Sequence, residues 1–341
     1  MTSRVAFLFP GQGSQAVGMG ADVFASSPAA RRVFAAADDA LGFSLSDLCF
    51  NGPEETLRDT INAQPAIVTV SLAYLAALQE ALSPEQSSWS SPLKPAFVAG
   101  HSVGEWSALP VAGALDLKET LLAVRERGRL MEHEGKVCPG GMSAVIAMDE
   151  EPLGQICQEA TEQALAEITG QPTHPGQGRV IIANYNAPGQ IVISGEKRAL
   201  ELAGELAKTR GAKRVIPLAV SGAFHSPVMQ PAVEGLSKTL AELELRDATI
   251  PVIANISGAP LSNASALRQE LTQQVASSVQ WVKTIQYLAE SGVTTFLEIG
   301  PGQALAGMVK RIAKGLTVMN VGKVEEVSKV AAQLREQGIV N

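Results

Sequence analysis

A serine flanked by glycines is the feature of this sequence that most directly suggests chemistry. The segment Gly100-His101-Ser102-Val103-Gly104 follows a short apolar run that ends at Ala99 and precedes a helical stretch that begins near Glu105. In this context the glycines allow a tight turn, the serine oxygen is held out of the sheet, and the helix N-terminus supplies N–H groups and a positive dipole. The pattern predicts that Ser102 is a nucleophile; the alternative is a glycine-rich turn without chemistry.

A serine nucleophile needs a base, and the chain has four histidines. His101 adjoins the serine but is expected to point away from it across the turn. His133 lies in a charged, exposed segment and His174 in a predicted loop. His225 follows a predicted strand, where sites gather in α/β sheets, and comes after Ser102 in chain order, as in α/β-hydrolases. We therefore predict His225 as the base, although a lone histidine is by itself more often structural.

Short apolar runs bounded by glycine or proline predict the strands that hold these residues. They span residues 5–9, 96–99, 252–256, 295–299 and 318–321. Long Ala- and Leu-rich segments between them predict helices, among them a buried helix that begins at Pro65 and ends near Leu82. This alternation predicts an α/β fold with a mostly parallel sheet.

The pattern changes between residues 138 and 220. Strand, helix, two strands, helix and strand are predicted there, over 143–148, 151–168, 180–185, 191–194, 196–208 and 214–218. This order is typical of a ferredoxin-like unit. We therefore predict a small ferredoxin-like subdomain at 138–220, inserted into a core of residues 1–137 and 221–341. The stretches 83–92 and 170–178 lack an apolar period and are predicted to be exposed loops.

Composition excludes several classes of function. The 341 residues suffice for one large domain with an embellishment or for two tightly associated subdomains. The formal charge is −7 and the basic residues are scattered, so a nucleic-acid binder is not expected. Cys49, Cys138 and Cys157 form no CxxC pair, which argues against disulfides or a zinc site and favours buried thiols. No secretory or membrane-length apolar segment is evident, so we expect a soluble, cytoplasmic protein.

Seven motifs together resemble the malonyl-CoA:acyl carrier protein transacylases in their order and approximate spacing. They are FPGQGSQ at 9–15, GHSVGE at 100–105, RG at 127–128, NYNAPGQ at 184–190, GAFHS at 222–226, VQW at 279–281 and EIGPG at 298–302. The resemblance extends from Val5 to about Gly322. It implies an α/β-hydrolase-like core that transfers malonyl from coenzyme A to the phosphopantetheine thiol of acyl carrier protein through an ester on Ser102, in fatty acid biosynthesis. The implied partners are malonyl-CoA and acyl carrier protein, with no cofactor of the enzyme's own and a monomeric state.

The resemblance also implies roles for individual residues. Ser102 becomes acylated, His225 is the base, and the backbone N–H groups of Gln12 and Val103 form the oxyanion hole. A main-chain carbonyl, here that of Gln274, orients the imidazole in place of a triad carboxylate.

Further positions of the resemblance concern the substrate. Arg127 matches the arginine that pairs with the malonyl carboxylate, and a planar guanidinium suits this capture, although the sequence alone leaves a helix-surface charge equally open. Phe224 resembles malonyl-type enzymes, in which the ring leaves little room for an α-methyl branch. Asn184 and Asn186 resemble positions near the base and the thioester ligand. Glu105 is assigned no catalytic role, because its place in a first helical turn explains an acid there.

Three other functions remain open. A serine esterase or thioesterase would use the same turn, but has no use for a carboxylate-binding arginine at position 127. A free-standing acyltransferase of a polyketide synthase has the same chemistry and a different carrier protein. A non-catalytic relative is disfavoured by the joint presence of Ser102, His225 and Gln12.

Overall fold

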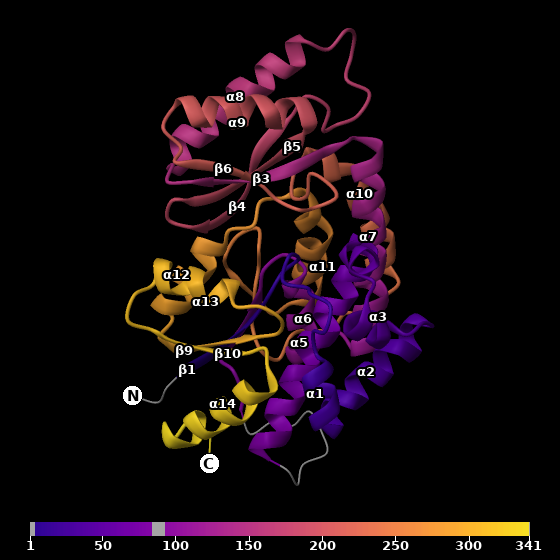
Figure 1. Ribbon diagram of the computed structural model, residues 1–341, viewed down its shortest axis with the longest axis vertical. Helices are drawn as coiled ribbons and strands as arrows, with labels where there is room; N and C mark the ends of the chain where they lie inside the picture. The colour runs from indigo at the N-terminus through magenta and orange to yellow at the C-terminus, as the bar shows by residue number, and fades with distance from the viewer. Residues whose placement is uncertain (1–3, 84–92, 341) are drawn as a thin grey trace.

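The computed structural model describes residues 4–83 and 93–340. The predicted loop at 83–92 lies outside the described residues except for Ser83. Among these residues a six-stranded sheet and a four-stranded sheet form two layers of one elongated molecule (Figure 1). The chain begins and ends at the same side of the larger sheet, far from the smaller one.

The larger sheet confirms the prediction of a mostly parallel α/β core. Its strands lie in the order β10 (Thr317–Val321), β9 (Val293–Ile299), β1 (Arg4–Phe9), β2 (Phe97–Gly100), β7 (Val252–Ile253) and β8 (Pro260–Leu261). All neighbours are parallel except β7 and β8. The predicted strand at 252–256 is wrong in its length. Its chain leaves the ladder at Ala254, whose N–H donates to the Ala259 carbonyl at 2.9 Å as the chain turns into β8.

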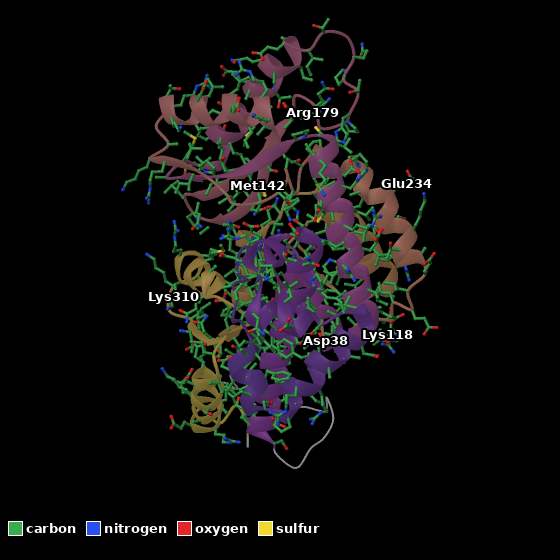
Figure 2. The ribbon with its side chains drawn as sticks, turned by 45° about the vertical axis from the view of Figure 1, so that its right-hand side comes forward. Asp38, Lys118, Met142, Arg179, Glu234 and Lys310 are labelled. Carbon is green, nitrogen blue, oxygen red and sulfur yellow. The ribbon has the colours of Figure 1, made fainter. Side chains whose placement is uncertain are left out.

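Helices surround this sheet, some packed on its strands and others on neighbouring helices (Figure 1). They are α1 (Ala21–Ser26), α2 (Pro28–Leu41), α3 (Leu45–Asn51), α4 (Glu54–Arg58), α5 (Thr60–Leu82), α6 (Gly104–Val111), α7 (Leu117–Val137), α10 (Gln230–Ala241), α11 (Ala264–Gln273), α12 (Trp281–Glu290), α13 (Ala304–Ile312) and α14 (Val324–Glu336). Short 3₁₀ turns, η1 (Pro227–Met229) and η2 (Gln274–Ala276), precede α10 and follow α11. Figure 2 shows exposed Lys118, Glu234 and Lys310 at the periphery, on α7, α10 and α13.

Helix α5 differs from its prediction in where it begins. It starts at Thr60, and Pro65 lies inside it. The N–H groups of Asn62 and Ala63 already donate to the Asp59 carbonyl, at 2.9 and 2.8 Å, so the first turn forms before the proline, which then removes a single helical N–H. By length and hydropathy α5 could cross a membrane, contrary to the sequence expectation, but 83% of its most apolar window is buried inside the protein, as in the core helix of a globular fold.

The smaller sheet is antiparallel and carries two helices on its outer face (Figure 1). Its elements follow the chain as β3 (Gly140–Ile146), α8 (Glu150–Ala166), β4 (Val180–Ala187), β5 (Gln190–Glu196), α9 (Lys197–Thr209) and β6 (Arg214–Pro217). The strand order β4-β5-β3-β6 is that of a ferredoxin-like unit. The domain boundaries at 138 and 220 stay a prediction.

Two hydrophobic clusters involve this unit, and one of them joins it to the rest of the molecule. One lies between its sheet and the helices α8 and α9, and includes Ile156 and Ile193. The opposite face of the sheet contributes Met142, Ala183 and Val192 to the main core of the molecule. The small sheet is therefore packed on both faces, and its inner face covers the carboxyl ends of the large sheet's strands.

The segment 170–178 is not the fully exposed loop that the sequence predicts. His174 Nε2 lies 3.2 Å from the Glu134 carboxylate of α7. Gly176 is buried, and a Cβ there would come within 2.4 Å of the Val228 Cα. This end of the loop is therefore folded onto the core, because a polar partner and a glycine allow close approach.

Candidate active site

The turn between β2 and α6 has the geometry of a nucleophile elbow. Ser102 has φ 53, a left-handed conformation that non-glycine residues rarely adopt. A Cβ at Gly100 would lie 1.9 Å from the Gly104 carbonyl carbon, and one at Gly104 would lie 2.2 Å from the Phe9 oxygen. Only glycine fits at both positions, so the motif residues are explained by the close packing of β1, β2 and α6 that holds Ser102 out of the sheet.

The structure brings Ser102 and His225 together from positions 123 residues apart. Ser102 Oγ lies 2.7 Å from His225 Nε2. His225 Nδ1 faces the carbonyl oxygens of Gln274 and Ser277, at 2.9 and 3.0 Å. Carbonyls only accept, so the Nδ1 proton donates to them and Nε2 keeps a free lone pair for the serine proton. His225 also has a left-handed φ of 57, a second strained residue at the same site.

Burial and a neighbouring positive charge keep His225 neutral. They lower the pKa of His225 from 6.5 to about 3, with burial the larger cause and Arg127 the next. Its hydrogen bond to the Gln274 carbonyl opposes this only in part. At neutral pH the imidazole is therefore unprotonated and able to accept a proton.

Arg127 reaches the nucleophile from α7. Its side chain is 1% exposed, and Nη2 donates to Ser102 Oγ at 3.2 Å and to Gln274 Oε1 at 2.8 Å. Nη1 donates to Gln64 Oε1 at 2.6 Å. Burial lowers the pKa of Arg127 to about 9, and the charge of Glu105 offsets part of this effect. The alternative of a helix-surface charge is thus wrong.

Arg127 has only neutral hydrogen-bond partners within reach. Across residues 4–83 and 93–340 no carboxylate lies within 4.0 Å of its guanidinium, and its buried Nε has no partner. A buried charge without a counter-ion is costly, so the site is electrostatically suited to an anionic ligand beside Ser102.

Two backbone N–H groups next to the elbow are free to bind a ligand. No hydrogen bond between described residues uses the N–H of Gln12 or of Val103. Gly11 packs against the elbow so closely that a Cβ there would lie 2.6 Å from the His101 oxygen. The Gln12 side chain is anchored separately, with Nε2 donating to Thr60 Oγ1 at 3.2 Å. The positions suit an oxyanion hole, and this role stays a prediction.

The remaining predicted residues lie around this centre. His101 turns away from Ser102, as predicted, and its Nε2 lies 2.8 Å from Asn186 Oδ1 of β4. Asn184 is buried, and its Oδ1 has no partner among the described residues. Phe224 is buried in the main core beside the base, where its ring restricts Gly222. The structure thus links Asn186 to the elbow, whereas Asn184 and Phe224 hydrogen-bond to neither Ser102 nor His225.

Sequence reasoning missed two residues that hold the site. Asn255 Oδ1 accepts from the Ser102 N–H, and its Nδ2 donates to the Gly100 carbonyl, both at 2.7 Å. Its signal was its place at the end of a predicted strand, on the same sheet edge as the elbow. Gln64, which binds Arg127, lies just before the predicted start of its helix at Pro65 and carried no comparable signal.

Glu105 lies in the first turn of α6 as expected, but this position does not account for its contacts. Its side chain makes no capping bond at the start of α6 and is fully buried. Instead the carboxylate accepts from the Asn255 N–H at 3.2 Å and forms a short hydrogen bond with Gln274 Nε2. The local pattern could not show this, because both partners lie at least 150 residues away.

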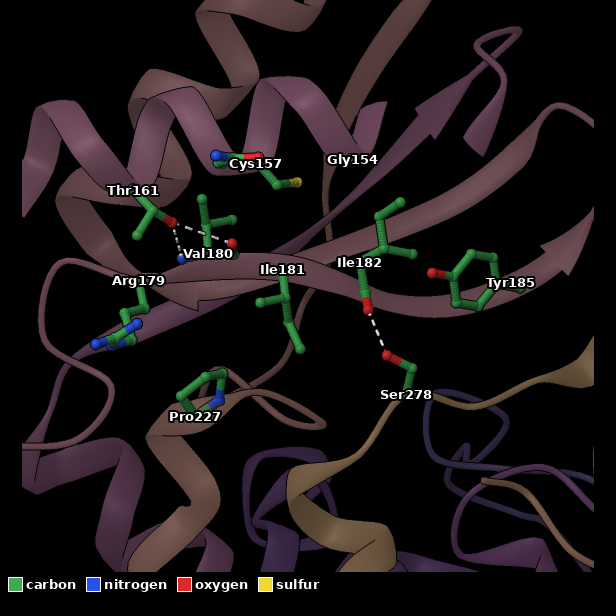
Figure 3. A pocket seen from close by; sticks show the side chains of 11 residues that line it. Gly154, Cys157, Thr161, Arg179, Val180, Ile181, Ile182, Tyr185, Pro227 and Ser278 are labelled. Atoms are coloured by element: carbon green, nitrogen blue, oxygen red, sulfur yellow. Dashed lines mark hydrogen bonds between the residues drawn. The ribbon is translucent and has the colours of Figure 1, made fainter. Parts of the chain in front are cut away.

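A groove of 380 Å³ lies between α8 and the edge strand β4, beside the loops that hold His225 (Figure 3). Thr161 Oγ1 bonds both the N–H and the carbonyl of Val180, and Ser278 Oγ donates to the Ile182 carbonyl at 2.6 Å. These contacts satisfy exposed polar groups of the edge strand. Burial raises the pKa of Cys157 in its wall to about 12, so this thiol is not a nucleophile at neutral pH.

The other thiols are also inert. Cys49 and Cys138 are buried and free, as predicted, and burial raises their pKa values to about 12 and about 11. Among the described residues no group of three or more His, Cys, Asp or Glu side chains is arranged to hold a metal ion.

Comparison with known proteins gives consistent matches over nearly the whole chain. The acyl transferase domain family matches residues 6–333. The malonyl CoA-acyl carrier protein transacylase of Bacillus subtilis is 42% identical over 335 residues, 98% of each chain. That of Escherichia coli K12 is 39% identical over 332 residues, 97% of this chain and 99% of the other.

Solved structures agree. The acyl-carrier-protein-S-malonyltransferase from Bartonella henselae superposes with a TM-score of 0.87 at 40% identity, covering 98% of this chain and 99% of the other. A malonyl-transacylase in complex with a type II polyketide synthase acyl-carrier protein superposes with a TM-score of 0.86 at 36% identity, covering 97% and 100%.

Proposed function

The chain belongs to the acyl transferase domain family, and we infer from this and from its site that it is an acyl-carrier-protein S-malonyltransferase. It transfers malonyl from coenzyme A to the phosphopantetheine thiol of acyl carrier protein, in fatty acid biosynthesis. The observation that carries the choice of acyl group is Arg127, a buried guanidinium 3.2 Å from the nucleophilic oxygen with no ion-pair partner among the described residues.

The first half reaction forms an ester on Ser102. As Oγ attacks the thioester carbon of malonyl-CoA, its proton moves to His225 Nε2, 2.7 Å away. The resulting oxyanion accepts hydrogen bonds from the N–H groups of Gln12 and Val103. When the carbonyl re-forms, the carbon–sulfur bond breaks and the coenzyme A sulfur leaves with the proton from His225.

The second half reaction is the reverse with another thiol. The phosphopantetheine thiol gives its proton to His225 and attacks the ester carbon. Collapse breaks the bond to Ser102 Oγ, which recovers a proton from the imidazole. One base serves both directions, because the Gln274 and Ser277 carbonyls hold its Nδ1 proton in place throughout.

The malonyl carboxylate also adjusts the base. Arg127 is one of the causes that lower the pKa of His225. A carboxylate paired with Arg127 offsets that charge and raises the pKa of His225 toward the working pH, where a general base is most effective. The acyl group that fits the arginine therefore restores basicity to the histidine that must activate Ser102.

Several further properties belong to this proposal. The chemistry needs no cofactor held by the enzyme, since the phosphopantetheine comes with the carrier protein. We propose that the protein acts as a cytoplasmic monomer, and that the buried Phe224 ring disfavours an α-methyl branch. A second candidate is the loading of a type II polyketide carrier protein, which the structural match to such a complex favours and which uses the same residues.

The proposal is tested by incubating the protein with isotopically labelled malonyl-CoA and either holo or apo acyl carrier protein. We expect label on the holo form alone, because only that form has a thiol to accept it. The same assay with the holo carrier of a type II polyketide synthase separates the two candidates. Release of free malonate faster than the carrier is loaded would show a thioesterase instead.

A further inference from the structure

A network of buried hydrogen bonds joins Glu105 to Ser102, to His225 and to Arg127. Both Glu105 and Gln274 are fully buried, and their side chains share a short hydrogen bond from Gln274 Nε2 to the carboxylate. The orientation of the Gln274 amide is fixed, because its Oε1 accepts from Arg127 and its Nε2 also donates to the Ser102 carbonyl at 3.1 Å. The Glu105 carboxylate thus fixes the Gln274 amide, which in turn binds Arg127.

The main chain of the same residue carries the base. The Gln274 carbonyl accepts the His225 Nδ1 proton at 2.9 Å, so a shift of Gln274 moves both Arg127 and His225. The residue lies in the 3₁₀ turn η2, directly after α11.

A second arm runs from Glu105 to the elbow. The other carboxylate oxygen accepts the Asn255 N–H at 3.2 Å. Asn255 in turn binds the N–H of Ser102 and the carbonyl of Gly100 through its amide. Since Ser102 is held in a left-handed conformation, it needs such contacts to stay there.

From these contacts we propose that Glu105 is a positioning residue that sets the carboxylate-binding arginine and the base through Gln274, and the nucleophile through Asn255. The proposal rests on the proposed function, because its test uses malonyl-CoA and acetyl-CoA as substrates. Glu105 keeps this place although burial, and next a nearby second acid, Glu270, raise its pKa; Glu270 is itself largely buried and accepts from the Ile256 N–H at 2.9 Å. Glu105 accepts hydrogen bonds at both oxygens, which a neutral amide of the same shape cannot do.

The test compares kcat/KM for malonyl-CoA and acetyl-CoA in the parent and in Glu105→Gln. The glutamine faces one of its two N–H donors with an NH₂ group, so one arm loses its acceptor. We expect kcat for malonyl-CoA to fall about 10- to 100-fold, as for a misplacement of about 1 Å, and the malonyl preference over acetyl to narrow. Glu105→Asp, which keeps both acceptors on a shorter side chain, should recover part of the preference.

Two comparison variants separate positioning from folding. Glu298→Gln replaces another buried acid, which binds the N–H groups of Leu305 and Ala306 at the start of α13. It should lower the melting temperature but leave the malonyl-to-acetyl ratio unchanged. Asn255→Ala breaks only the elbow arm and should slow acylation by both substrates equally.

If the ratio of kcat/KM for malonyl-CoA to that for acetyl-CoA were unchanged in folded Glu105→Gln, the proposal would be overturned. The same holds if Glu298→Gln reduced this ratio as much as Glu105→Gln does. If Glu105→Gln does not fold, the ratio in Glu105→Asp decides in the same way. A parent protein that fails to load malonyl would refute the proposed function instead, so the two failures are distinguishable.

Discussion

Replacement of Arg127 by alanine should change which acyl group is accepted. The guanidinium is fully buried, and its pKa falls from the ordinary 12.5 to about 9. The difference, 12.5 − 9 = 3.5, corresponds to a net penalty on the order of 5 kcal/mol for the charged form at 1.36 kcal/mol per pKa unit, after the favourable effect of Glu105. A malonyl carboxylate supplies the missing counter-ion, whereas an acetyl group leaves the charge unpaired.

The magnitude follows from this difference. Breaking a buried ion pair by removing one partner costs about 3–5 kcal/mol, which corresponds to a malonyl preference of roughly 10²- to 4 × 10³-fold in the parent. Arg127→Ala removes the pairing that favours malonyl and the unpaired charge that penalises acetyl. The preference should therefore narrow by about two orders of magnitude or invert. Loss of the bonds to Gln64 and Gln274 affects both substrates and cancels in the ratio.

The assay is kcat/KM for malonyl-CoA and acetyl-CoA with a saturating holo carrier protein. Arg129→Ala is the matched control, because Arg129 lies on the same helix but is exposed and paired with Glu126. It should change neither constant appreciably. If both substrates lost the same factor in Arg127→Ala, the arginine would be structural and the electrostatic reasoning would be refuted.

Three further outcomes are expected. His225→Ala should slow acylation of the serine about 10²- to 10⁴-fold in single-turnover measurements, and a rate near that of the parent would remove it as the base. Because the pKa of His225 is lowered to about 3, kcat/KM of the parent should stay level as pH falls from 7 to about 5. In Arg127→Gln the fall of kcat/KM on the acid side of the pH profile should move to higher pH. A fall of kcat/KM near pH 6.5 in the parent would contradict this. Gly100→Ala should destabilise the protein by about 1–3 kcal/mol in denaturant titrations, because the added methyl group clashes with Gly104. Gly307→Ala, in open space on α13, should stabilise the protein slightly. Equal effects of the two substitutions would show that the elbow is not tightly packed.

The same His225 shift has a consequence for stability. Between pH 6.5 and about 3 the unfolded chain binds a proton that the folded protein does not, so this residue's contribution to stability falls as pH falls through that range. Glu270 acts in the opposite direction. Its pKa is raised by burial to about 7, so the folded protein holds the extra proton and loses stability as pH rises from 4.5 toward 7.

The parts of the site that local sequence could predict are those made by consecutive residues. The G-x-S-x-G turn fixes its own geometry, since the approach of Gly100 to Gly104 demands glycine whatever the rest of the chain does. The end of β2 places Ser102 at the carboxyl edge of the parallel sheet, whereas His225 comes from the loop after β6 of the small antiparallel sheet. The pairing of His225 with the Gln274 carbonyl came from the resemblance, not from any local pattern.

What the sequence could not show are contacts between distant polar residues inside the core. Glu105 looks like an ordinary acid in a first helical turn, and only the fold reveals that its partners are residues 255 and 274. Arg127 could not be told from the neighbouring Arg125, whose guanidinium instead lies over the Phe43 ring at 4.6 Å. The two residues are two positions apart and so lie on different faces of α7, and the periodicity of a mixed helix is too weak to show which face is buried.

The central claim is that Ser102 carries the acyl group, and intact-mass analysis after incubation with malonyl-CoA tests it most directly. We expect a mass increase of one malonyl group, located on the peptide that contains Ser102, absent in Ser102→Ala and discharged when holo carrier protein is added. Loss of one oxygen at the elbow should leave the fold intact, which circular dichroism checks. Malonyl transfer by Ser102→Ala at the parental rate, or an adduct on any other residue that is discharged by the carrier, would contradict the account.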